Sequence, residues 1–155
     1  MICVNIPDYK EFKFKNVVFD YNGTLAVDGK LDKDTRENLM KLSQMADVYV
    51  LTADTYGSVE KECKGLSVTV KTFPNDGASS HKKDVIKDLE GQSICVGNGF
   101  NDIEMFDASD LSIAIVGDEG CSGKLLTHSD IVVHGRKDLF QLFFSTNRIK
   151  ATLRG

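Results

Sequence analysis

The sequence predicts an α/β protein: a doubly wound, three-layer sandwich in which helices cover both faces of a mainly parallel central sheet. Short apolar runs alternate along the chain with segments of helical periodicity, which is the pattern of such sheets. Several runs are apolar throughout, as expected for strands that are covered on both faces. Three of them end abruptly in polar or Gly-rich residues, at the carboxyl end where open α/β sheets bind ligands.

Length and composition limit the function classes. At 155 residues the chain is predicted to form one domain (1–155), with an N-terminal hairpin at about 1–15 and a core at about 16–155. A net charge of −4 argues against nucleic acid as a partner. No apolar run approaches the roughly 18 residues that a membrane span needs. The four cysteines lack CxxC or metal-type spacing, so we expect a cytoplasmic protein.

The elements can be placed in order. Alternation at 2–6 and 11–14 around a Pro-Asp turn predicts an antiparallel hairpin at one edge or end of the sheet, before a central strand at Val17–Asp20. Asp28-Gly29 predicts a small flap at 26–30, and Asp32 is placed to cap a helix with Leu39, Leu42 and Met45 on one face. The remaining predictions are strands at 48–52, 68–73, 93–96, 111–116 and 131–133, and helices near 56–64, 80–89, 103–108 and from about 137.

Four segments carry candidate chemistry. The first is DYNGTLA, which begins at Asp20 and puts a carboxylate at the end of a buried strand, where it can serve as a covalent nucleophile. By itself this segment is weak, because a turn rich in Asn and Gly explains it equally well. The others are LTAD at 51–54, a lysine (Lys82 or Lys83) that opens a helical pattern, and the Gly-rich acidic loop GNGFND at 97–102.

In this order the four segments resemble the haloacid dehalogenase superfamily. They are most similar to the phosphorylation domain of P-type ATPases and its small soluble relatives, where the pattern reads DKTGTLT, LTGD, K and GDGxND. The likeness spans roughly 16–133. It implies a Rossmann-like fold and a Mg²⁺-dependent phosphohydrolase or phosphotransferase that forms an aspartyl-phosphate on Asp20. Too few residues separate the first two motifs for an inserted domain, so no cap is expected.

The resemblance also implies roles for single residues. The catalytic set is Asp20, Asn22, Thr52 and Lys82; the phosphate-binding set is Thr52, Ala53, Lys82 and Asn101; the metal set is Asp20, Asn22, Asn98 and Asp102. Lys82 is preferred over Lys83 because the apolar positions at +3, +4 and +7 then match the family. Asp54 could equally cap the next helix.

Two positions depart from the family pattern. Hydrolytic relatives have at Asn22 a second Asp that protonates the leaving group and activates water, whereas P-type ATPases have a neutral Thr and keep a long-lived phosphoenzyme. Losing such acid–base help typically costs about 10²–10⁴ in rate. Asn98 replaces the first acid of GDGxND, and one charge at roughly 4 Å is worth about 4 kcal/mol before desolvation offsets it. We therefore expect slow turnover and weak Mg²⁺ binding.

Other functions stay open at this point. The fold could serve as a phosphate-binding or regulatory module that has lost turnover, or as a phosphorylation domain that acts on a partner. Without a cap, the predicted partners are a small phosphorylated substrate or a phosphoprotein. A second subunit of a homo-oligomer could shield the open crevice.

Overall fold

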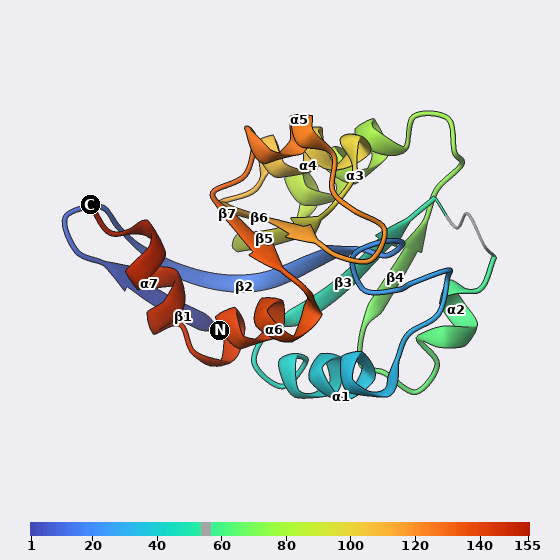
Figure 1. The fold of residues 1–155 in the computed structure, drawn as a ribbon, viewed down its shortest axis with the longest axis horizontal. Helices are drawn as coiled ribbons and strands as arrows, with labels where there is room; N and C mark the ends of the chain where they lie inside the picture. The colour runs from blue at the N-terminus through green and yellow to red at the C-terminus, as the bar shows by residue number, and fades with distance from the viewer. Residues whose placement is uncertain (54–56) are drawn as a thin grey trace.

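A computed structural model describes residues 1–53 and 57–155. The predicted Asp54 site and the predicted helix start at Tyr56 lie outside the described residues. One seven-stranded sheet has the order β4-β3-β2-β5-β6-β7, and β1 pairs with β2 (Figure 1). The strand pairs along this path are parallel, and β1 is antiparallel to β2. The predicted fold class is confirmed.

The strands are β1 Ile2–Ile6, β2 Lys10–Asp20, β3 Asp47–Thr52, β4 Thr69–Thr72, β5 Gln92–Gly97, β6 Leu111–Val116 and β7 Ile131–His134. The helices are α1 Lys33–Leu42, α2 Val59–Glu62, α3 Ala78–Asp88, α4 Ile103–Ala108, α5 Gly123–Leu126, α6 Arg136–Phe144 and α7 Asn147–Leu153, and a 3₁₀ turn at Phe100–Asp102 precedes α4. Among the described residues, no helix combines the length and apolarity that crossing a bilayer requires.

Helices cover both faces of the sheet. In Figure 1, α3, α4 and α5 lie on one face, and α1, α2 and α6 lie on the other. Alternate residues of β2 fill the two layers, because successive side chains in a strand point to opposite faces. Phe19 packs against Phe140 and Phe143 of α6, at ring-centroid distances of 5.9 and 6.0 Å, whereas Val18 belongs to the cluster on the α3–α4 side. Burial on both faces explains why the run before Asp20 is apolar throughout.

The second strand of the predicted hairpin and the first central strand form one continuous strand. β2 runs for 11 residues; its first half pairs with β1, and its second half lies between β3 and β5. The polar Asn16, which lies between the two predicted strands, is buried and donates from Nδ2 to the carbonyl of Glu90 at 2.9 Å. Its polarity is therefore satisfied inside the sheet.

Two local predictions are confirmed near the site. In the flap, Val27 and Lys30 exchange backbone hydrogen bonds of 3.1 and 3.0 Å across Asp28 and Gly29, whose φ angles are 51° and 78°. Two consecutive positive φ angles are those of a type I′ hairpin turn, for which Asp-Gly is a preferred pair. At the start of α1, the Asp32 side chain accepts from the Thr35 amide at 2.7 Å.

One difference concerns the C-terminal helix. The predicted C-terminal helix is two helices, because the chain leaves helical geometry at Ser145 (φ −131°, ψ 74°). The second of them, α7, lies beside β1 and buries Ile149 completely (Figure 1). Between β2 and β3 the chain holds only the flap and α1, so no cap domain is inserted there.

Candidate active site

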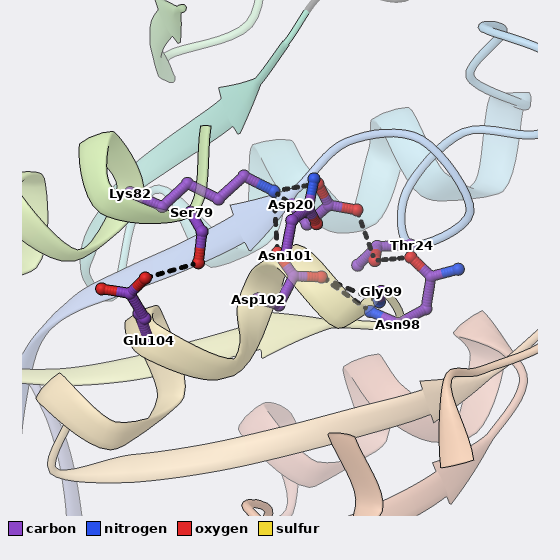
Figure 2. A network of polar contacts seen from close by, with 9 residues as sticks. All are labelled: Asp20, Thr24, Ser79, Lys82, Asn98, Gly99, Asn101, Asp102 and Glu104. Atoms are coloured by element: carbon purple, nitrogen blue, oxygen red, sulfur yellow. Dashed lines mark hydrogen bonds and ion pairs between the residues drawn. The ribbon is translucent and has the colours of Figure 1, made fainter. Parts of the chain in front are cut away.

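Three of the four predicted segments meet at the carboxyl edge of the sheet because of the strand order. β2, which ends at Asp20, lies between β3, which ends at Thr52, and β5, which ends at Gly97. Parallel strands that are neighbours end on the same edge, so these residues converge as the sequence predicted. The fourth segment arrives from α3, whose Lys82 reaches across to Asp20 (Figure 2).

Asp20 is held in place through both of its carboxylate oxygens. Oδ1 accepts from Lys82 Nζ at 2.7 Å, and Oδ2 accepts from Thr24 Oγ1 at 3.1 Å. Burial, together with the nearby charge of Asp102, raises the pKa of Asp20 to about 6, and Lys82 and the two hydrogen bonds only partly oppose that rise. The side chain is still 10% exposed, so a substrate can reach it.

Lys82, and not Lys83, is the lysine of the site. Its ammonium is 1% exposed and bridges Asp20 Oδ1 and Asp102 Oδ1, both at 2.7 Å. Burial by itself would lower the pKa of Lys82, but the two carboxylates outweigh it and hold that pKa above its usual range. Lys83 instead pairs with Glu104 of α4 at the surface. The buried cluster therefore carries two negative charges and one fixed positive charge.

Asp102 has no free oxygen. Oδ1 faces Lys82, and Oδ2 accepts the backbone N–H groups of Asn98 and Gly99 at 3.1 and 2.9 Å (Figure 2). A Cβ at Gly97 would lie 2.4 Å from Oδ2, so only glycine fits at that point of the loop. Asp102 therefore holds the Lys82 ammonium beside Asp20, and its role as a metal ligand stays a prediction.

Thr24 and Asn98 are linked to the second carboxylate oxygen of Asp20, the one that Lys82 does not contact. Thr24 Oγ1 lies 3.1 Å from Asp20 Oδ2 and 3.3 Å from Asn98 Oδ1, while Asn98 Nδ2 donates to the carbonyl of Gly120 at 3.2 Å. Sequence reasoning did not assign Thr24 a role, although its place in DYNGT was the available signal. The contact to Gly120 had no sequence signal, because the two residues are 22 positions apart.

Asn22 has an unsatisfied oxygen. Its Oδ1 is buried, and no described residue donates a hydrogen bond to it. A buried polar atom without a partner is uncommon and calls for a ligand, an ion or a water. The oxygens of Asp20, Asn22 and Asn98 are the hard donors that Mg²⁺ prefers, so the residues present fit that ion. Among the described residues, no group of three or more His, Cys, Asp or Glu could hold a metal, so any such site must include the amide oxygens.

The remaining predicted residues lie around the same cluster. Thr52 is buried at the end of β3, and its carbonyl accepts from the Phe73 amide at 3.0 Å. Ala53 follows it and is half-buried. Asn101 is exposed, with Oδ1 3.5 Å from Lys82 Nζ. Their phosphate-binding roles stay predictions.

Replacing Asp20 by Asn is expected to stabilise the metal-free protein. A carboxyl whose pKa is raised from 3.8 to about 6 on folding binds its proton more tightly in the folded state. Unfolding free energy therefore falls as pH rises through that interval and stays low above it. At pH 7 this penalty is on the order of 1–3 kcal/mol, and Asp20→Asn should remove it.

The measurement is urea denaturation in EDTA at about pH 7 and about pH 4, the ends of the window that this pKa shift defines. Asp20→Asn should be more stable than the wild type at the higher pH and similar to it at the lower. A variant that is less stable than the wild type at neutral pH would contradict this description of the cluster.

The fold and the converging residues define the class of protein: the chain has the fold of the haloacid dehalogenase superfamily, in its form without a cap, as the four motifs indicated. No family model matches the sequence. An uncharacterised protein of Methanocaldococcus jannaschii is 44% identical over 61 residues, which are 39% of this chain and 66% of that protein. A soluble P-type ATPase-like phosphatase of the same organism is 24% identical over 123 residues, which are 77% of this chain and 45% of that protein.

A solved structure extends the likeness to almost the whole chain. The 3-deoxy-D-manno-octulosonate 8-phosphate phosphatase of Moraxella catarrhalis, in complex with magnesium, phosphate and its sugar, matches with a TM-score of 0.68 at 16% identity, over 91% of this chain and 94% of that one. At this identity the match establishes the fold. Two of these three proteins, the soluble P-type ATPase-like phosphatase and the solved sugar-phosphate phosphatase, are phosphatases, in agreement with the enzyme class predicted from the motifs.

Proposed function

We propose that the chain is a phosphohydrolase or phosphotransferase that works through an aspartyl-phosphate on Asp20. The observation that carries the proposal is the shared ammonium: Lys82 is fixed between the nucleophile and Asp102 at the ligand-binding edge of the sheet. Phosphoryl transfer needs an in-line nucleophile and positive charge around the transferred group, and this cluster supplies both. Such a charge is effective because the ammonium is shielded from water.

In the proposed reaction, a carboxylate oxygen of Asp20 forms a bond to phosphorus while the ester P–O bond breaks. Lys82 and the end of β3 at Thr52 are placed to hold the oxygens of the phosphoryl group. The leaving oxygen must take its proton from water or keep its charge, because the amide of Asn22 cannot transfer one. The amide of Asn22 also cannot take a proton from the attacking water. Hydrolysis of the aspartyl-phosphate is therefore slow, and Asp20 stays phosphorylated for most of each catalytic cycle.

We further propose Mg²⁺ as the cofactor, held by Asp20, the main-chain carbonyl of Asn22 and the side-chain oxygen of Asn98. When bound, the ion would neutralise phosphoryl charge. Asp102, whose Oδ1 shares the Lys82 ammonium with Asp20, belongs to the predicted metal set as well. The oxygen donors of these residues, which are the kind that Mg²⁺ prefers, support the proposal.

The substrate we propose is a small phosphate monoester or a phosphorylated protein, since nothing inserted between β2 and β3 closes the crevice. A second subunit that covers the crevice is part of the proposal. The four cysteines are free thiols, which supports a reducing cytoplasm as the compartment.

The test is the hydrolysis of p-nitrophenyl phosphate across a Mg²⁺ titration. We expect slow release of nitrophenol that requires the metal and is abolished in Asp20→Asn, because that change removes the nucleophile. Equal rates in the wild type and Asp20→Asn would overturn the proposal.

A second candidate is a phosphate-binding module without turnover, which the neutral side chains at Asn22 and Asn98 favour. Phosphate or beryllium fluoride that protects the fold against heat, in a protein that releases no nitrophenol under any metal concentration, would select this function.

A further inference from the structure

The loop between β6 and α5 (residues 117–122, hereafter the 117–122 loop) packs against the turn that carries the nucleophile. Its first residue approaches that turn closely: a Cβ at Gly117 would lie 3.6 Å from the carbonyl oxygen of Gly23. Its last residue is fixed to the fourth motif, because the Ser122 amide donates to the carbonyl of Asn98 at 2.8 Å. The loop therefore forms one side of the crevice above Asp20.

The Asn98 side chain provides the connection at the middle of this loop. Nδ2 donates to the Gly120 carbonyl at 3.2 Å. Oδ1 lies 3.3 Å from Thr24 Oγ1, as Figure 2 shows. A carbonyl oxygen can only accept, so the NH₂ end of the amide must face Gly120. The NH₂ end of the Asn98 side chain thus contacts the loop, and its oxygen faces the turn that carries the nucleophile.

A carboxylate at this position cannot perform both tasks. An ionised Asp has no donor, so one of its oxygens would face the Gly120 carbonyl oxygen without a hydrogen bond. Gly23 leaves room for this amide, since a Cβ at Gly23 would lie only 2.3 Å from Asn98 Nδ2. The loss of the acidic residue at 98 is therefore linked to a specific contact that only an amide makes.

We propose that Asn98 is a positioning residue that fastens the 117–122 loop beside the nucleophile, and that this loop is the wall against which the substrate's leaving group packs. The first half of the proposal concerns the free protein and is independent of catalysis. The second half rests on the proposed function and names the segment that takes the place of a cap in selecting substrates.

The first test is hydrogen exchange of the loop peptide in EDTA, on Asn98→Asp and on the matched change Asn101→Asp. Asn101 lies in the same motif, but its side-chain oxygen faces Lys82 and not the loop, so Asn101→Asp controls for the added charge. We expect exchange over 117–122 to accelerate about threefold to tenfold in Asn98→Asp, the factor expected for one hydrogen bond, and to stay at the wild-type rate in Asn101→Asp. Equal acceleration in both variants, no acceleration in Asn98→Asp, or a rise spread evenly over β2 and β5 would overturn the proposal.

The second test changes the loop and leaves Asn98 intact. Gly120 has φ +76°, and nothing lies within 4 Å of the place where its Cβ would be. The first carbon of a new side chain therefore has room, but Gly120→Val cannot adopt this backbone angle without strain. We expect faster loop exchange and, with p-nitrophenyl phosphate, a KM raised about threefold to tenfold at a kcat within about twofold, because a lost substrate contact outside the reacting atoms weakens binding. With acetyl phosphate, whose leaving group is small, KM should not change.

A Gly120→Val variant whose loop exchanges faster while both KM values stay at the wild-type level would overturn the substrate-wall half. If the wild type itself shows no turnover, the proposed function fails, and the exchange comparison still decides the role of Asn98.

Discussion

Replacing Lys82 by Met is expected to cost about 3–5 kcal/mol of unfolding free energy, the usual consequence of removing one partner from a buried ion pair. Two carboxylates, Asp20 and Asp102, would then face each other in a water-poor pocket without their shared cation. Met keeps most of the length and volume of the lysine stem, so the loss reports the charge and not a cavity. Thermal and urea denaturation measure it directly.

The neighbouring residue gives a matched control. Lys83→Met makes the same chemical change one position along α3, but Lys83 forms a half-buried pair with Glu104 at the surface, and ion pairs near the surface contribute little to stability. The double variant Asp20→Asn with Lys82→Met should recover part of the loss, because it leaves one buried carboxylate in place of two. Equal effects at the two lysines would show that the cluster is not formed as described.

The second large effect is a gain of activity. Asn22→Asp should raise phosphatase turnover by about 10–1000-fold, because the new acid restores part of the roughly 10²–10⁴-fold contribution of general acid–base catalysis. The buried oxygen of Asn22 has no partner among the residues that the structure describes, so an acid can be introduced there without breaking a hydrogen bond of that oxygen. A carboxyl at this position could protonate the leaving group and then take a proton from the attacking water.

Initial rates with p-nitrophenyl phosphate across a Mg²⁺ titration measure the gain. Asn38→Asp, on α1, adds the same charge away from the motifs and should leave the rate unchanged. The protein must be freshly purified, since Asn22-Gly23 is a sequence prone to deamidation. A wild type that is already fast and unchanged by Asn22→Asp would show that another group carries the proton.

The structure changes what is expected of Asn98→Asp. By charge alone this substitution should tighten Mg²⁺ binding, because it restores a carboxylate beside the ion. The amide, however, donates to Gly120, and the acid would lose that bond. The Mg²⁺ affinity gained from the added charge is therefore opposed by the lost hydrogen bond to the loop. The combined variant with Asn22→Asp should gain less Mg²⁺ affinity than charge alone predicts.

Much of the fold could be predicted because both periodicity and strand-end chemistry are local signals. The apolar run before Asp20, the Asp-Gly turn of the flap and the Asp32 cap each specify one conformation from a few neighbouring residues. Lys82 could be preferred over Lys83 only through the resemblance, because the apolar positions at +3, +4 and +7 then match the family pattern.

What could not be predicted depends on contacts between distant segments. The continuity of β2 through Asn16 relies on a hydrogen bond to Glu90, and the role of Asp102 relies on which groups occupy its two oxygens. The link from Asn98 to Gly120 joins two loops that follow different strands. Short helices such as α5, with four residues, have too little periodicity to be recognised and exist because tertiary contacts hold them.

The central claim is that Asp20 becomes covalently phosphorylated, and it can be tested without knowledge of the substrate. The protein is incubated with acetyl phosphate and Mg²⁺, quenched in acid and examined as intact protein and as peptides by mass spectrometry. We expect the mass of one phosphoryl group on the peptide that contains Asp20, persistent in the wild type, shorter-lived in Asn22→Asp and absent in Asp20→Asn. Phosphorylation of Asp20→Asn to the same extent as the wild type, or a label on another residue, would contradict the account.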